Sequence, residues 1–305
     1  MKSAGNLIIM LLLLLPFVIG ANTYSERINP SSIKIYQTAT DYKFKDAAAL
    51  IEKTIPSSSV SPVENLSVIN YYWWKLISGD RNGYFAQSIY TKVDALHRNY
   101  SKPGVSINDE LLFYLVSVYA FEARVCLLDH SYRRAITSLS KYYSVLKTSF
   151  GKENLHPELN LTTGLFYFFI AHAREKLPVF SPILKTYYNG SKQSGYDMIV
   201  KASKIDNEIV SEQSMYFLMK INFDISENYN LSEYYCRKLI SRYPGNLLYE
   251  YYLFKIFIAT DQKIKTRDQI LVIHYYSENN KQLTYDESTF YVNKAKNEFA
   301  EKYQQ

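Results

Sequence analysis

The sequence predicts an all-α fold of antiparallel helix pairs, on three observations. The chain has 305 residues, 47% of them hydrophobic, but only 10 Gly and 9 Pro. These are too few turn signals for a β-sandwich, which needs one every ~8–12 residues. Apolar residues recur with the period of a helix, and no convincing alternation of period two is present. Short polar turns separate the helical stretches, which favours a helical bundle or an α-solenoid.

The first helix is predicted to begin at Asp41, a good N-cap residue, and to end at the Thr54–Ser59 turn. Next come two helices separated by Gly79–Gly83, and a further pair separated by the Asp129–Ser131 turn. With the helix after His156, the predicted ranges in this half are 62–78, 84–98, 109–128, 132–148 and 158–175.

The second half continues the pattern after an irregular connection that Pro178 and Pro182 bracket. The predicted helices are 193–205, 212–224, 231–242, 247–260, 266–277 and 285–303. The last of these is polar, so we expect it to cap the C-terminal end of the stack.

The N-terminus has the layout of a secretory signal peptide. Lys2 precedes an apolar run from Leu7 to Ile19, and the small residues Gly20 and Ala21 follow it. A membrane span needs ~20 apolar residues, so cleavage after residues 1–21 is favoured over an uncleaved anchor. Residues 22–40 are then a polar linker, and residues 41–305 form one helical domain. The expected product is exported, soluble and periplasmic or associated with the cell envelope, with no membrane span.

Charge excludes one class of partner. Cleavage at Ala21 lowers the formal net charge from +6 to +5, and basic residues are dispersed among acidic ones. Nucleic-acid binders carry a basic patch or block, so no nucleic-acid partner is predicted. The two cysteines, Cys126 and Cys236, lie in helical apolar stripes, which favours buried free thiols; a disulfide between them stays open.

Residues 216–244 carry the pattern that decides between a bundle and a solenoid. An aromatic residue, large apolar residues, a small residue and a closing proline follow one another: Tyr216, Met219, Phe223, Ser232, Cys236, Leu239 and Pro244. This segment resembles the tetratricopeptide (TPR) repeat. The resemblance implies a TPR-like α-solenoid, in which small residues allow close helix crossings and proline ends the second helix.

A shift of 34 residues, the length of this repeat, tests the resemblance. Four apolar positions map onto apolar residues, namely Leu253, Phe257, Ile270 and Ile273, whereas Tyr216 maps onto Glu250. An earlier copy surrounds Tyr119, Ala123 and Cys126, but Glu122 stands there where the repeat usually has Leu.

The wider sequence resembles a group of exported bacterial TPR-like proteins. The resemblance lies in the run Leu161–Phe168, the Pro178 connection and the Gly195 helix before the repeat. It implies a scaffold that binds a protein or peptide partner through a concave helical face, without chemistry of its own. The predicted partner contacts are Tyr71, Trp74, Tyr119 and Tyr216.

The aromatic run Tyr71–Trp74 leaves two alternatives open. Four consecutive aromatics point around more than half of a helix, so neighbouring helices bury them or they form a binding patch. Exposed rings would also suit a glycan, which makes a glycan-binding or glycan-processing component of the cell envelope the alternative function.

The sequence has no recognised catalytic motif beside the repeat-like helices. None of the five His forms a His-Glu-x-x-His motif, and no Gly-x-Ser-x-Gly elbow occurs. Gly190–Gly195 has the glycine spacing of a phosphate loop but lacks its Lys, so a helix cap is favoured. Asp109 and Glu110 form a carboxylate pair that no other motif supports. The sequence therefore predicts a protein that is not an enzyme, without a metal or cofactor.

Overall fold

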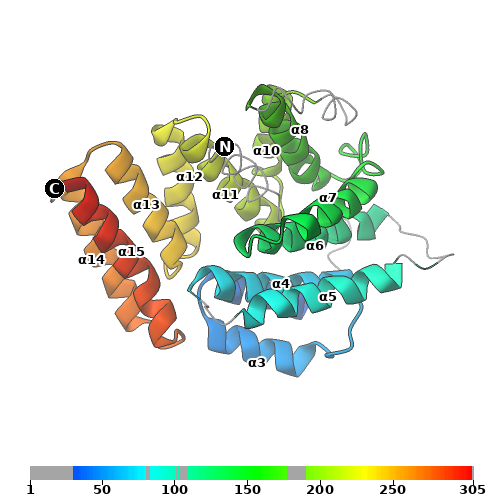
Figure 1. Ribbon diagram of the computed structural model, residues 1–305, viewed down its shortest axis with the longest axis horizontal. Helices are drawn as coiled ribbons and strands as arrows, with labels where there is room; N and C mark the ends of the chain where they lie inside the picture. Colours follow the sequence, from blue (N-terminus) through cyan, green and yellow to red (C-terminus); the bar gives the residue numbers. More distant parts are fainter. Residues whose placement is uncertain (1–29, 80–82, 101, 103–108, 177–189, 304–305) are drawn as a thin grey trace. The chain divides into compact units, whose positions relative to one another are not determined.

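The computed structural model describes residues 30–79, 83–100, 102, 109–176 and 190–303, and its regular elements there are all α-helices (Figure 1). Within these described residues there are thirteen helices: α2 (Pro30–Thr40), α3 (Phe44–Thr54), α4 (Pro62–Ile77), α5 (Tyr84–Tyr100), α6 (Asp109–Leu128), α7 (Tyr132–Leu146), α8 (Leu159–Lys176), α10 (Lys192–Ala202), α11 (Glu208–Asp224), α12 (Tyr229–Arg242), α13 (Leu247–Ala259), α14 (Lys263–Asn279) and α15 (Tyr285–Tyr303). The predicted all-α class is confirmed. Among these helices none has the length and apolar character to cross a membrane.

The predicted helices are all present, and the predicted limits of α6 and α15 match the structure. The predicted signal peptide (residues 1–21) and the irregular connection at Pro178 and Pro182 lie outside the described residues. Elsewhere the ends differ by a few residues, as frayed helix termini commonly do.

The linker predicted for residues 22–40 is wrong over its second half, where residues 30–40 form α2. Ile35, Tyr36 and Ala39 are buried on one face of this helix, which packs against α3. Asp41 is not an N-cap either, because α3 begins at Phe44 after a turn in which Tyr42 has a positive φ of 59°. The helical period in residues 30–40 is short and diluted by polar residues, so tertiary packing rather than sequence pattern forms this helix.

The described chain divides into two compact units. The first unit includes Val60–Leu66 and Ile89–Phe217, and the second includes Asn29–Ser59, Ser67–Ser88 and Leu218–Gln305. In the first unit α6 packs against α7, and α8 against α10. In the second unit α12, α13, α14 and α15 pack in sequence, so antiparallel neighbours form as predicted (Figure 1).

The second unit also joins helices that are far apart in the sequence. The Asn246 side-chain amide donates a hydrogen bond of 2.6 Å to the backbone oxygen of Thr40, and the Tyr291 hydroxyl donates one of 2.7 Å to that of Ile77. In a solenoid each repeat contacts only its neighbours. Here α15, the predicted cap, contacts α4 as well as α13 and α14, which departs from the predicted linear stack.

The four apolar pairs that are 34 residues apart are buried in both copies, except that Phe223 is only partly buried. They are Met219, Phe223, Cys236 and Leu239 in the first copy and Leu253, Phe257, Ile270 and Ile273 in the second. The mismatched pair, Tyr216 and Glu250, is buried too. Both cysteines are free and buried, as the apolar stripes predicted.

The Gly190–Gly195 segment caps a helix, as predicted in preference to a phosphate loop. The Ser191 side chain accepts a hydrogen bond from the backbone of Ser194, whose side chain accepts one in return from the backbone of Ser191. This capping box starts α10. Gly195 then faces Gly164 of α8, and their lack of side chains lets the two helices approach closely.

Candidate functional site

The four predicted partner contacts are divided between the two units, and three of them are buried. Trp74 and Tyr119 are each 3% exposed and Tyr216 is 8% exposed, whereas Tyr71 is half-buried. Tyr71 and Trp74 belong to the second unit, and Tyr119 and Tyr216 belong to the first. Their contact with a partner stays a prediction, but three of them offer little surface for it.

The aromatic run on α4 is mainly core. The Trp74 ring lies 5.7 Å from that of Tyr42 and 5.9 Å from that of Tyr249, both in edge-to-face geometry. Trp73 is buried as well, so the two indoles leave little ring surface to stack on a sugar. The buried alternative therefore holds for both tryptophans.

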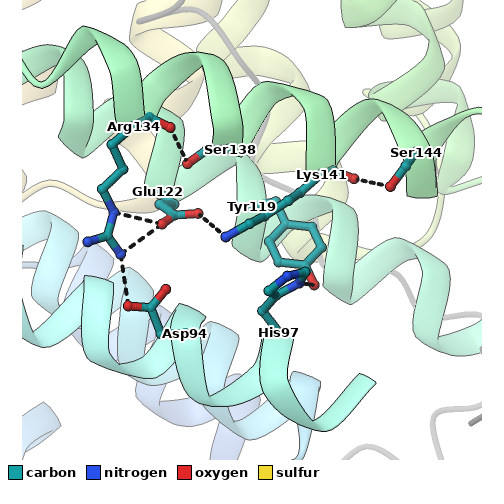
Figure 2. Close-up of polar contacts among 8 residues, drawn as sticks. All are labelled: Asp94, His97, Tyr119, Glu122, Arg134, Ser138, Lys141 and Ser144. Atoms are coloured by element: carbon teal, nitrogen blue, oxygen red, sulfur yellow. Dashed lines mark hydrogen bonds and ion pairs between the residues drawn. The ribbon is translucent and has the colours of Figure 1, made fainter. Parts of the chain in front are cut away.

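A group of charged and polar side chains lies in the first unit, between α5, α6 and α7 (Figure 2). Helix geometry gathers it, because residues three, four or seven apart share one face. The contributions are Asp94 and His97 from α5, Tyr119 and Glu122 from α6, and Arg134, Ser138 and Lys141 from α7.

Glu122 is the buried centre of this group, with 1% exposure. The Arg134 guanidinium donates from Nε at 2.9 Å to Oε1 of Glu122, and its second arm reaches Oδ2 of Asp94 at 3.0 Å. The Tyr90 ring, 4.0 Å from the guanidinium carbon, stacks against it. Burial alone would lower the pKa of Arg134, but Glu122 and then Asp94 outweigh burial and raise it.

The other oxygen of Glu122 has no such bond. Oε2 is buried and accepts no hydrogen bond from any residue that the structure describes. The nitrogen of the Lys141 ammonium lies 3.9 Å from it. This distance gives electrostatic attraction but exceeds the 2.7–3.2 Å of a hydrogen bond. The carboxylate and the ammonium thus form an ion pair without a hydrogen bond between them (Figure 2).

These groups line an open pocket of about 350 Å³, hereafter the charged pocket. Its lining residues are Asp94, Glu122, Arg134, Thr137, Ser138 and Lys141. Two carboxylates and two cations leave it with no formal net charge. The Ser138 hydroxyl donates to the backbone oxygen of Arg134 at 2.9 Å, so its proton is already used.

His97 and Tyr119 lie beside the charged pocket, with Tyr119 Oη 3.2 Å from Nδ1 of His97. Burial, with a smaller contribution from Glu122, raises the pKa of Tyr119 to about 12. Burial and the nearby Lys141 ammonium lower the pKa of His97. Near neutral pH a protonated phenol therefore meets a neutral imidazole, and the pair adds no charge to the pocket.

Sequence reasoning missed Asp94, Arg134 and Lys141 and found only Tyr119, which lies one turn from Glu122. The signal that was available is Glu122 itself, a carboxylate where the repeat pattern places Leu. A charged residue at a position predicted to be buried requires partners from neighbouring helices. In the structure, Arg134 and Lys141 of α7 are those partners of Glu122.

Comparison of this chain with protein-family models, with curated proteins and with solved structures found no match in any of the three. The function proposed below therefore rests on the geometry of the pocket and on the sequence pattern.

Proposed function

We propose that the protein is a TPR-like binding scaffold, without catalytic activity, that anchors a peptide segment of a partner protein in the charged pocket. The observation that carries this proposal is Oε2 of Glu122, a buried carboxylate oxygen without a hydrogen bond beside an open pocket. Leaving a buried acceptor unsatisfied costs ~1–3 kcal/mol, and more for a charged group. The oxygen has no solvent contact, so a ligand donor reaches it by displacing the neighbouring Lys141 side chain, and the new hydrogen bond recovers that free energy.

The size of the pocket favours a peptide side chain as the ligand over a drug-sized molecule that would have to fit inside it whole. Its volume of about 350 Å³ is at the lower end of the range for ligand pockets. It therefore accommodates one anchoring group of a longer ligand, and a peptide side chain is such a group. Thr137, Arg134 and Asp94 remain partly or largely exposed, so chain on either side of the anchor can follow the α5 and α7 surfaces.

We place the protein in the cell envelope on the pattern of residues 1–21 alone. Its first 21 residues would be absent from the native protein, and N-terminal sequencing of that protein tests this. A chain that still begins at Met1 would contradict export by cleavage.

Peptide display against the full chain tests the binding function. Selected peptides should bind the wild type and lose at least tenfold in affinity when Lys141→Glu reverses the pocket charge. Lys147, the exposed C-cap residue of α7, gives the matched control. Lys147→Glu makes the same charge reversal outside the pocket and should leave the affinity unchanged. Failure to select any peptide, or equal loss in both variants, would contradict the proposal.

A further inference from the structure

We propose that the group the charged pocket takes is a primary carboxamide, the side chain of an Asn or Gln on the partner, bridging Glu122 and Lys141. This inference rests on the proposed function and specifies the chemistry of the anchor. Two properties of the pocket carry it: its charge balance, and the spacing of Lys141 and Glu122, which form an ion pair without a hydrogen bond.

The charge balance favours a neutral ligand. An ammonium entering the pocket would meet Arg134 and Lys141, and a carboxylate would meet Asp94 and Glu122. Each sign thus faces a like charge in a partly buried site, where such contacts are screened only weakly. A neutral group with a strong dipole has attractive contacts without that repulsion.

The spacing of Lys141 and Glu122 selects among neutral groups. The pocket has an N–H donor at Lys141 Nζ and an acceptor at Glu122 Oε2, and the two atoms lie 3.9 Å apart. A primary carboxamide carries its oxygen and an N–H together on one edge, so it can accept from Nζ and donate to Oε2 at once. A second N–H remains for another acceptor, such as the Asp94 carboxylate on the pocket wall.

Secondary amides do not match this spacing. In a trans peptide bond the N–H and C=O point to opposite sides, so one backbone amide cannot reach both Lys141 and Glu122. The same holds for the acetamido group of an N-acetylated sugar. A hydroxyl can also donate and accept with one oxygen, but it has no second hydrogen for a further acceptor such as Asp94.

Ligand-observed NMR with blocked amino acids tests the carboxamide without assuming any peptide. The probes are the N-acetyl methylamides of Gln, Asn, Glu, Lys, Met and Ser, with N-acetylglucosamine as the sugar arm. We expect the Gln or Asn derivative to bind at least tenfold more tightly than every other probe. Equal or tighter binding of any other probe, or no binding of any probe, would overturn the inference.

A substitution locates the bound probe. Lys141→Met keeps the unbranched side chain but removes the donor, and it should abolish the preference for the amide. Lys147→Met on the same helix is the control and should retain it. Unchanged Gln binding in Lys141→Met, with the same melting temperature as the wild type, would overturn the inference.

The outcomes separate this inference from the proposed function. Selected peptides that lose affinity with Lys141→Glu but contain no essential Asn or Gln would uphold the function and overturn the carboxamide. Binding of the Gln derivative without any peptide binding would do the reverse.

Discussion

The backbones of Gly164 in α8 and Gly195 in α10 are so close that a Cβ atom built on Gly195 would lie 2.5 Å from the Gly164 carbonyl oxygen. The same atom would lie 2.5 Å from the backbone nitrogen of Phe168. Both obstacles are backbone atoms of a helix, which cannot move aside as a flexible side chain can. The crossing of α8 and α10 therefore requires glycine at this position.

Gly195→Ala should destabilise the first unit by ~2 kcal/mol or more, because the added methyl group forces the two helices apart. Alanine otherwise favours a helix by up to ~1 kcal/mol over glycine, so propensity alone predicts the opposite sign. Urea unfolding followed by circular dichroism measures the change. Lys201→Ala, an exposed change on the same helix, is the control and should have little effect. A stabilised Gly195→Ala variant would refute the close crossing.

Arg134 should couple more strongly to Glu122 than to Asp94. Glu122 is 1% exposed and the Asp94 side chain is 41% exposed, while each accepts from the same guanidinium. Exposed pairs contribute ~0.2–1 kcal/mol, whereas breaking a buried pair leaves an uncompensated charge and costs several kcal/mol. Double-mutant cycles with Arg134→Met, Glu122→Gln and Asp94→Asn measure both couplings. Equal coupling energies would show that Glu122 is hydrated.

Glu250 should make the second unit less stable as the pH rises towards 7. Burial raises its pKa to about 7, although the Gln269 amide donates to its Oε2 at 2.6 Å. Since the pKa is higher in the folded than in the unfolded state, the native protein keeps this proton longer. The stabilisation is complete below pH ~4.5 and is lost as the pH rises through 7.

Glu250→Gln removes this titration and can still accept from Gln269. The variant should gain on the order of 3 kcal/mol over the wild type at pH 8 and little at pH 4.5, since one unit of pKa is worth about 1.4 kcal/mol. Unfolding curves across this pH range measure the difference. The exposed Glu301→Gln on α15 is the control. A difference that does not change with pH would contradict a raised pKa for Glu250.

Residues 30–40 should be essential for the stability of the second unit. The buried Asn246 donates to the backbone oxygen of Thr40, while its own side chain caps α13. Asn246→Ser keeps a capping oxygen, but its shorter side chain does not reach the Thr40 oxygen, so it should cost ~1–3 kcal/mol. Deletion of residues up to 40 should cost more, because it also exposes the core around Ile35. A deletion that leaves the melting temperature unchanged would support a linker instead.

Among the described helices, periodicity was sufficient to predict those with a long apolar stripe, α3–α8 and α10–α15. It missed α2, where burial of a few apolar residues against α3 and the contact at Thr40 take the place of a pattern. The charged pocket was beyond prediction for a similar reason. Asp94, Glu122 and Arg134 are separate in the sequence and meet only when three helices pack, so no local spacing marks them.

Site-specific photo-crosslinking at Thr137 tests the central claim, that the charged pocket is where a partner binds, most directly. Thr137 is exposed on the pocket lining, and Thr148, exposed beyond the end of α7, is the matched control. With a peptide selected against the wild type, a photoreactive residue at position 137 should give a crosslinked product, and one at 148 should not. Lys141→Glu should abolish that product. Crosslinking at 148 alone, or a product at 137 that persists with Lys141→Glu, would contradict the claim.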